Sequence, residues 1–342
     1  MARRTTPSPT VADVAAHAQV SVPTVSKVLN NRPDIAEATR RRVEAAIVAT
    51  GYQRRTPSSV RKARAGLVDV VVHGINSPWV LEVLAGAEAA AHRAGVGMVL
   101  SSVHGGELGE RWVRALERRR SDGVVIVVSD IPPETLERLI ESHVPVVLLD
   151  RTGNSDPRLA SVGAANWSGA LSATQHLIDL GHRRIGVISG HPRLACSAER
   201  IDGYLAALRR AGIAVDEELV RHGDFFPEGG GTGAAALLSL PEPPTAIFAG
   251  SDLQALGVYE EARARGLRVP HDLSVVGFDD LSMAQYVTPP LTTVRQPHAE
   301  MAAEAVRMVL AMGKSDHAVE SVRRELATTL VVRESTAGPS AS

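Results

Sequence analysis

The first fifty residues place hydrophobic side chains at helical spacing in three short blocks. Over 11–18 and 22–30 an apolar residue returns every three or four positions, and a longer block over about 37–50 repeats the pattern. Ser21 precedes the second block, where a hydroxyl can cap the first turn of a helix. Only three residues separate the first two blocks, which is the spacing of a helix–turn–helix. The pattern therefore predicts a small all-α domain over residues 10–52.

Beyond residue 66 the pattern changes to apolar runs of about six residues, which alternate with amphipathic stretches of helical length. The runs with strand character are 67–72, 96–101, 123–128, 144–149, 184–189, 245–250 and 273–278. The helical stretches are 79–94, 107–120, 167–180, 198–211, 230–239, 252–265 and 298–312. Apolar strands separated by helices are typical of parallel sheets with both faces covered. Two such sets predict two parallel-sheet α/β lobes, one over about 66–165 plus 296–326 and the other over about 166–295.

The segments that flank these domains have a different composition. Residues 1–9 are small, polar and basic, and we expect them and the last residues, 334–342, to be disordered tails. Residues 53–65 contain five Arg or Lys among small residues, which predicts a basic hinge or linker. The two-lobed body is then expected to span 66–333.

The net charge of −1 hides an uneven distribution along the chain. Residues 1–65 contain twelve Lys or Arg against four Asp or Glu, a net charge of +8, which leaves −9 for the rest of the chain. A basic head on an acidic body is a usual arrangement for a nucleic-acid-binding module attached to a non-binding domain. A disordered basic tail is the alternative that charge alone leaves open.

Cysteine content and hydropathy exclude several classes of protein. The single cysteine, Cys196, cannot form an intrachain disulfide framework or a Cys-rich metal site, which fits a reducing compartment. No apolar run approaches the roughly 20 residues of a membrane helix, and the basic N-terminus leads into no apolar signal-peptide core. We therefore expect a cytoplasmic protein without membrane contact.

The second helix of the predicted helix–turn–helix carries the candidate DNA contacts. Such a helix enters the major groove with its N-terminal side chains towards the base edges. The positions expected to face DNA are Ser21, Val22, Pro23, Thr24, Ser26 and Lys27. Hydroxyl and ammonium groups can bind phosphates or bases, whereas Val and Pro offer apolar contact to a thymine methyl. A generic helical hairpin is the alternative interpretation.

These residues resemble a known family. The segment TVADVAAHAQVSVPTVSKVLN at 10–30, followed by a helix that ends in GY at 51–52, is similar to the DNA-binding headpiece of the LacI family of bacterial transcriptional regulators. The resemblance continues through the body in LIDLGHRRIGVISG at 177–190, PTAIFAGSDLQALGV at 244–258 and LSVVGFDDL at 273–281. It covers nearly the whole chain.

The resemblance implies a homodimer whose two headpieces bind a near-palindromic operator in double-stranded DNA. It implies a body similar to periplasmic sugar-binding proteins, with a small ligand in the cleft between its lobes. It also implies a hinge helix that inserts an apolar wedge into the minor groove. The DNA-binding set is then completed by Thr10, Asn30, Tyr52, Arg55 and Val60.

Three positions depart from the family pattern. The turn carries Gln19 in place of the usual Gly, and Ala36 stands where a Ser or Thr normally caps the third helix, a loss of about 1 kcal/mol. In the hinge, Arg61 stands where the wedge Leu is usual, and one deleted residue puts Val60 in the wedge position instead.

Polar and aromatic side chains follow the carboxyl ends of the predicted strands, where open α/β sheets bind ligands. The candidate effector-binding residues are Asn76, Trp79, Asp150, Trp167, Arg200, Phe225, Phe226, Asp252, Asp279 and Gln296. Carboxylates and amides pair with hydroxyl groups, Arg donates in a planar fork, and aromatic rings stack on sugar rings. Core or rim packing of the aromatic residues is the alternative.

The family resemblance assigns effector contacts to four of these candidates and stacking to two more. The contacts are Asp150, Arg200, Asp279 and Gln296, and the stacking residues are Trp79 and Phe226. Asp252 could instead hold the local loop. The sequence thus favours a polyhydroxylated ligand.

No catalytic constellation, metal site or cofactor site is expected. The glycine-rich stretch at 228–238 lacks the Lys-Ser/Thr pair of a phosphate-binding loop, and it more readily begins a helix. The histidines show no metal-ligand spacing, Cys196 has no assignable base, and there is no GxSxG elbow.

The sequence therefore predicts a DNA-binding transcriptional repressor in the bacterial cytoplasm, at the nucleoid. Its operator binding is expected to be relieved by a mono- or oligosaccharide bound between the lobes. Two alternatives stay open: co-repression by a purine or phosphorylated metabolite, and a sugar-responsive activator. Two other classes of protein are excluded. The basic helix–turn–helix head excludes a sugar-transport protein, and the lack of a phosphate-binding loop excludes a sugar kinase.

Overall fold

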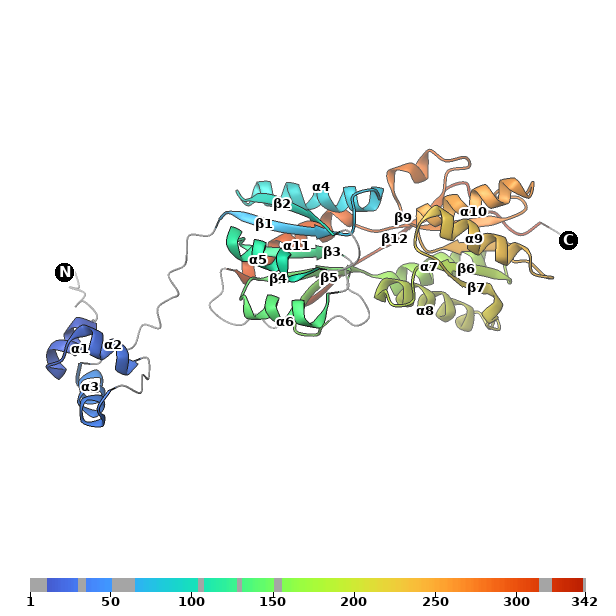
Figure 1. The fold of residues 1–342 in the computed structure, drawn as a ribbon. Helices are drawn as coiled ribbons and strands as arrows, with labels where there is room; N and C mark the ends of the chain where they lie inside the picture. Colours follow the sequence, from blue (N-terminus) through green and yellow to red (C-terminus); the bar gives the residue numbers. More distant parts are fainter. Residues whose placement is uncertain are drawn as a thin grey trace, which may run out of the picture. The chain divides into compact units, whose positions relative to one another are not determined.

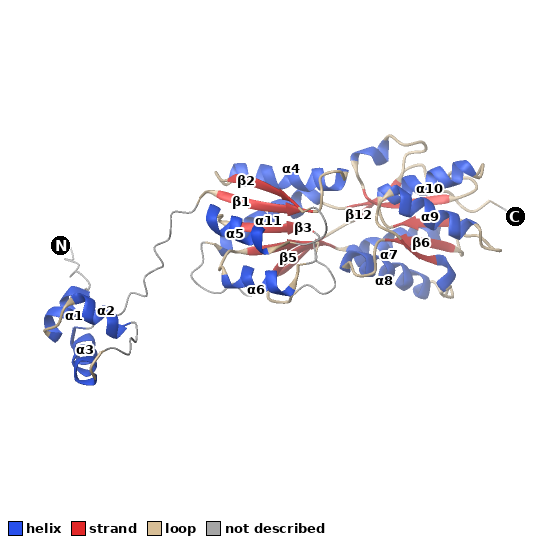
Figure 2. Ribbon diagram, viewed as in Figure 1, coloured by secondary structure: helices blue, strands red, loops and turns tan. Residues whose placement is uncertain are grey.

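The computed structural model divides the chain into two compact units, Met1–Ala63 and Arg64–Ser342. The structure describes residues 11–29, 35–50, 65–103, 108–127, 131–150, 156–313 and 322–340 (Figure 1). Helices and strands alternate through most of the second unit, whereas the described part of the first is helical (Figure 2). The expected organisation of an all-α head followed by an α/β body is confirmed.

The head is built from α1 (Val11–Ala18), α2 (Val22–Leu29) and α3 (Glu37–Thr50). Its core consists of small apolar residues at the spacing seen in the sequence: Val14, Ala15, Ala18, Val25, Val28, Val43 and Ala46, all buried. β-branched and Ala side chains fill this core because three short helices leave little interior volume.

Two departures from the family pattern have a visible structural basis in the head. Gln19, in the turn between α1 and α2, has φ 51°, a left-handed conformation that glycine adopts without steric cost. The Ala36 carbonyl accepts hydrogen bonds from the amides of Thr39 and Arg40 at 2.9 and 3.0 Å, so Ala36 begins α3 without a capping side chain. Neither position thus carries the residue that would stabilise the local backbone best, which is Gly at 19 and a capping Ser or Thr at 36.

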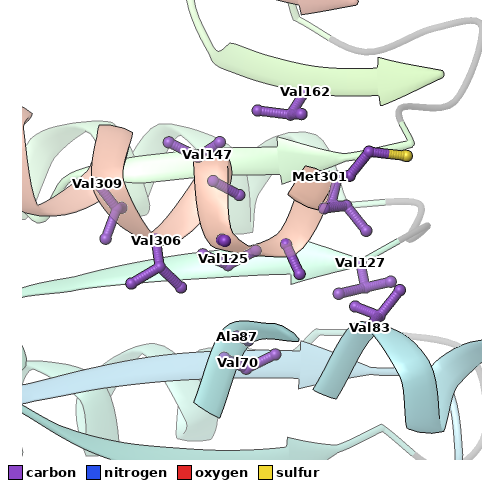
Figure 3. Packing of buried hydrophobic residues seen from close by; sticks show 14 of the residues in the cluster. Val70, Val83, Ala87, Val125, Val127, Val147, Val162, Met301, Val306 and Val309 are labelled. Carbon is purple, nitrogen blue, oxygen red and sulfur yellow. The ribbon is translucent and has the colours of Figure 1, made fainter. Parts of the chain in front are cut away.

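The first lobe of the body is a six-stranded, fully parallel sheet in the order β11-β5-β4-β3-β1-β2. The strands are β1 (Leu67–Val72), β2 (Gly97–Ser102), β3 (Gly123–Val127), β4 (Val146–Leu149), β5 (Ala160–Ala164) and β11 (Arg323–Leu326). One face is covered by α4 (Pro78–Arg93) and α11 (His298–Met312), and the other by α5 (Glu110–Arg119) and α6 (Pro133–Glu141). Valines dominate the packing under α4 and α11 (Figure 3).

The second lobe is another six-stranded sheet in the order β12-β10-β9-β8-β6-β7, in which only β12 is antiparallel to its neighbour. Its strands are β6 (Ile185–Ser189), β7 (Val220–His222), β8 (Ala246–Ala249), β9 (Ser274–Asp279), β10 (Thr292–Arg295) and β12 (Thr329–Val331). α7 (Asn166–Asp179) and α8 (Ala195–Arg210) cover one face, and α9 (Pro227–Leu238) and α10 (Asp252–Ala264) the other. Short 3-10 helices lie at Glu217–Leu219 and Ser282–Gln285.

The chain crosses between the two sheets three times, each time at the carboxyl end of a strand. It passes from β5 into α7, from β10 into α11, and from β11 into β12. The carboxyl ends of both sheets therefore face each other, and the loops that follow those strands converge between the lobes.

The C-terminal segment corrects one expectation. Residues 334–340, expected to form a disordered tail, pack on the second sheet, and Ser335 is fully buried. Its hydroxyl donates to the Val275 carbonyl at 2.6 Å and accepts from the Thr292 amide at 2.8 Å. Hydrogen bonds of small polar residues hold this segment, and hydropathy does not detect such an attachment. The second lobe thus includes β12 and the residues after it.

The glycine-rich stretch lies inside α9. A Cβ at Gly230 would overlap the Gln254 backbone of α10, and one at Gly257 would overlap the Pro227 carbonyl. The glycines thus let α9 and α10 pack in close contact.

Candidate functional site

A cavity of ≈ 230 Å³ lies between the lobes of the body and is called the interlobe cavity below. Its lining from the first lobe is His73, Asn76, Ser77, Trp79, Val80, Val127 and Asp150. Its lining from the second is Leu194, Cys196, Arg200, Asp224, Phe225, Phe226, Ser251, Leu253 and Asp279. Seven of the ten effector-binding candidates are thus brought together. Trp167, Asp252 and Gln296 do not line the cavity.

Arg200 reaches the cavity from α8 and is held on several sides. Its Nε donates to Asn166 Oδ1 at 2.9 Å, and its Nη1 donates to the Gly250 carbonyl. The guanidinium stacks on the Phe278 ring at 3.8 Å and lies 3.9 Å from Asp279 Oδ1. Because this planar group is fixed before any ligand arrives, little side-chain entropy is lost when it donates to one.

Asp150 and Asp279 supply carboxylates from opposite lobes. Both are buried, and both have positive φ angles, 52° and 119°. Burial raises the pKa of Asp150 to about 6, against the lowering effect of Arg200 and His298. Burial also raises the pKa of Asp279, which accepts a 2.6 Å hydrogen bond from Gln296 Nε2. Among the described residues, no side chain donates a hydrogen bond to Asp150. Desolvated acceptors of this kind suit a ligand rich in hydroxyl groups.

Aromatic side chains border the cavity in both lobes. Trp79 lies edge-on to His298 at 6.0 Å between ring centroids, and His298 Nδ1 is 2.8 Å from Glu82 Oε2. In the second lobe the Ser251 hydroxyl donates to the Phe225 carbonyl at 2.8 Å, which fixes the loop that carries Phe225 and Phe226. These rings are positioned to stack on a flat apolar ligand face.

The three remaining candidates have other roles. Trp167 lies at the start of α7 with the Arg210 guanidinium 5.6 Å from its ring centroid. Asp252 is fully buried and accepts from the Leu281 amide at 2.7 Å and the Thr293 hydroxyl at 2.5 Å, so it holds the loop after β9. Gln296 is buried behind Asp279 and orients that carboxylate. These placements favour the alternative given for Asp252 and remove Trp167 and Gln296 from the cavity wall.

Sequence reasoning missed several lining residues. His73 follows β1, a predicted strand, so its position was available from the same argument that found Asn76 and its neighbour Ser77. Asp224 follows β7, a three-residue strand that hydropathy does not show. Cys196 lies at the start of α8, where burial raises the pKa of its thiol to about 12, so it is a poor nucleophile.

In the head, the candidate DNA contacts divide into capping and exposed residues. The Ser21 hydroxyl accepts from the Thr24 amide at 3.3 Å and lies 2.8 Å from the Thr24 hydroxyl, so it caps α2. Val22 is 46% exposed, and Pro23, Ser26 and Lys27 are also exposed, opposite the buried face of α2. The remaining candidates lie outside the described residues: Thr10, Asn30, Tyr52, Arg55 and Val60.

No helix in the described part of the chain is long and apolar enough to cross a membrane. Within the same residues, no group of three or more His, Cys, Asp or Glu side chains is placed to hold a metal ion.

Two family models match the chain. Residues 10–55 match the bacterial regulatory proteins of the lacI family, and residues 174–336 match a periplasmic-binding-protein-like domain. The HTH-type transcriptional repressor CytR of Escherichia coli K12 is 34% identical over 330 residues, which cover 96% of each protein. The chain belongs to the LacI family.

Solved structures agree with this assignment over the full length. The complex of the transcriptional regulator CelR with cellobiose is 35% identical, with a TM-score of 0.72, and covers 96% of this chain and 99% of that one. The lac repressor dimer bound to operator is 26% identical, with a TM-score of 0.71, and covers 97% of this chain and 100% of that one. The protein is thus a DNA-binding transcriptional regulator with an effector-binding body, and not an enzyme.

The buried carboxyl of Asp150 leads to a prediction about stability. Since its folded pKa of about 6 lies above the unfolded value, the native state binds the extra proton, and this group lowers stability as pH rises from about 4 to 6. Asp150→Asn keeps the shape and the tolerance for positive φ but removes the charge. We expect the variant to be more stable than the parent at pH 7.5, by up to about 3 kcal/mol, and to lose this advantage near pH 4. Urea denaturation at the two pH values measures the difference.

Asp156 provides the matched control for this prediction. Its side-chain hydrogen bond from Arg158 lowers its pKa, so Asp156→Asn is expected to change stability in the opposite direction at pH 7.5. An advantage of Asp150→Asn that stays the same at both pH values would show that burial of the charge is not its cause.

Proposed function

We propose that this protein represses transcription and that a small saccharide in the interlobe cavity releases it from its operator. The observation that carries the proposal is the pairing of buried carboxylates from both lobes with a fixed guanidinium and flanking aromatic rings. Hydroxyl groups pair with the first two, and a sugar ring face stacks on the third. The similarity to the CelR–cellobiose complex supports the same ligand class.

Charge argues against a phosphorylated effector. Among the described residues that line the cavity, three carry carboxylates, Asp150, Asp224 and Asp279, and one, Arg200, carries a guanidinium. That guanidinium already faces Asp279 at 3.9 Å. An anionic ligand would be desolvated next to an excess of negative charge, which is costly in a buried site. A neutral polyol meets no such penalty.

The architecture supports release by a change in lobe angle. A ligand that contacts both lobes binds one relative angle better than others, and it shifts the protein towards that state by its difference in affinity. The similarity to the lac repressor dimer supports a homodimer on a near-palindromic site in double-stranded DNA, in the bacterial cytoplasm.

A titration with defined ligands tests the proposal. Full-length protein is bound to a DNA duplex recovered by binding-site selection and is titrated separately with cellobiose, ribose, a purine base and a hexose phosphate. We expect a neutral saccharide to lower DNA occupancy. Tightening of the DNA complex by the purine or the phosphate would establish co-repression in place of release.

The exposed face of α2 leads to a prediction about sequence preference. Lys27→Ala is expected to weaken binding to all DNA sequences and to lower the salt dependence of binding, as loss of a phosphate contact does. Val22→Ala, at the N-terminus of the same helix, is expected to change the preferred bases instead. Binding-site selection with each variant measures both effects. The docking of α2 is wrong if the Val22 variant selects the parent sequence.

A further inference from the structure

Two neighbouring residues of α8 connect to different parts of the body. Arg200 lines the interlobe cavity. Glu199 instead accepts a hydrogen bond at Oε1 from Arg323 Nη2, 3.0 Å away. Arg323 begins β11, at the edge of the first sheet, whereas α8 covers the second. The Glu199–Arg323 ion pair therefore joins the two lobes directly.

Asn166 connects this ion pair to the cavity. It is buried at the start of α7, immediately after the first crossing between the lobes. Its Oδ1 accepts from Arg200 Nε at 2.9 Å, and its Nδ2 donates to Glu199 Oε2 at 3.3 Å and to the Ala164 carbonyl at 3.1 Å. An unbroken chain of hydrogen bonds thus runs from Arg200 through Asn166 and Glu199 to Arg323.

This chain also borders a second, small void between the lobes. The void measures ≈ 20 Å³, which is room for about one water molecule. Asn166, Glu199 and Arg323 line it together with Asp150 and Cys196, which also line the interlobe cavity. Residues of both lobes form its walls, so a change in lobe angle must widen or close it.

We propose that Asn166, Glu199 and Arg323 are positioning residues that hold Arg200 in the cavity and tie its helix to the first lobe. The single side-chain amide of Asn166 makes two hydrogen bonds to α8, one with Arg200 and one with Glu199. It keeps both only while α8 and the crossing from β5 into α7 hold their relative positions. A ligand that draws the guanidinium towards itself therefore acts on the same amide that supports the interlobe ion pair. The position of Arg200 and the lobe angle change together.

The proposal rests on the proposed function only in treating the interlobe cavity as the effector site, and its test uses no effector. Spin labels are attached to the full-length protein at exposed Glu141 of α6 and exposed Arg209 of α8, one on each lobe. A noncanonical amino acid carries each label, so buried Cys196 is not modified. Labelled chains are diluted with unlabelled chains, and pulsed electron resonance measures the distance distribution between the lobes.

Glu199→Gln and Arg323→Gln are each expected to broaden this distribution towards longer distances. Loss of a partly exposed ion pair changes a population ratio by roughly two- to fivefold. The charge-swapped double variant, Glu199→Arg with Arg323→Glu, restores the ion pair but not the Asn166–Glu199 hydrogen bond, so it is expected to narrow the distribution relative to either single variant.

Glu325→Gln is the matched control on the same strand. Glu325 lies 3.5 Å from Arg323 within one lobe, so removing its charge leaves Glu199 as the partner of Arg323 and is expected to leave the distribution unchanged. Parent-like distributions for both single variants would overturn the proposal. So would a charge swap as broad as the single variants, because the effect would then come from local disruption and not from the interlobe pair.

Discussion

A chain that begins at residue 66 is expected to lose operator binding by at least about a thousandfold while its body stays folded. The head and the body are separate compact units, so removing one does not expose the core of the other. The loss is large because residues 1–65 carry a net charge of +8 and the remainder carries −9, which repels DNA. Specific DNA complexes are typically about 10³–10⁷ times tighter than non-specific ones, which sets the scale. A gel-shift titration with a selected DNA duplex measures the loss.

Salt dependence gives an independent check on the same head. For the full chain, affinity for the selected duplex is expected to fall by at least about a hundredfold between 50 and 200 mM salt, as displaced counterions supply much of the binding free energy. Thermal unfolding of the shortened chain should keep the transition of the body. Binding that is insensitive to salt would contradict the electrostatic role of the head.

Arg200→Gln is expected to weaken the response to effector strongly while leaving operator binding intact. The substitution removes the planar fork that donates into the cavity and leaves a bound ligand's acceptors, and the Asp279 carboxylate, without their cation. A lost charged hydrogen bond in a buried site costs about 2–3 kcal/mol, so the effector concentration for half-release should rise by a factor of roughly 30 to 150. Titration of the DNA complex with the saccharide that the ligand panel identifies gives this value.

Arg210→Gln is the matched control for this prediction. Arg210 ends the same helix and lies over Trp167, outside the cavity, so its loss should leave the half-release concentration at the parent value. Equal effects of the two substitutions would show that Trp167 belongs to the effector site after all and that the cavity is assigned wrongly.

Periodicity predicted the elements with buried apolar faces. The three head helices begin within a residue of their expected positions, because each buries a stripe of Val and Ala against the other two. The runs at 67–72 and 273–278 likewise became central strands of the two sheets. Five of the described strands were missed. The edge strands β7, β11 and β12 are three or four residues long and partly exposed, so they leave no apolar run in the sequence. The interior strands β5 and β10 are buried but consist mainly of Ala, Ser, Gly and Thr, which give no apolar run either.

The site residues that could be predicted from the sequence are those that directly follow a strand. Asp150 and Asp279 each end a predicted strand, so their convergence followed from parallel topology. The different role of Asp252 could not be predicted in this way, because it depends on which way one side chain turns at the start of α10. There it accepts from the Leu281 amide and the Thr293 hydroxyl, partners that are distant in sequence.

The three crossings between the sheets have a consequence for protein synthesis. Each lobe has an edge strand from the same late segment of the chain. β11 of the first sheet and β12 of the second together span only residues 323–331. During translation the head can fold on the ribosome early, because the helices described for it, α1, α2 and α3, lie within the first 50 residues. The first lobe remains incomplete until residue 326 has emerged, and the second until β12 and the segment that holds Ser335 have followed. A premature stop between codons 313 and 323 would therefore release a chain with an intact DNA-binding head in which each effector-binding lobe lacks a strand.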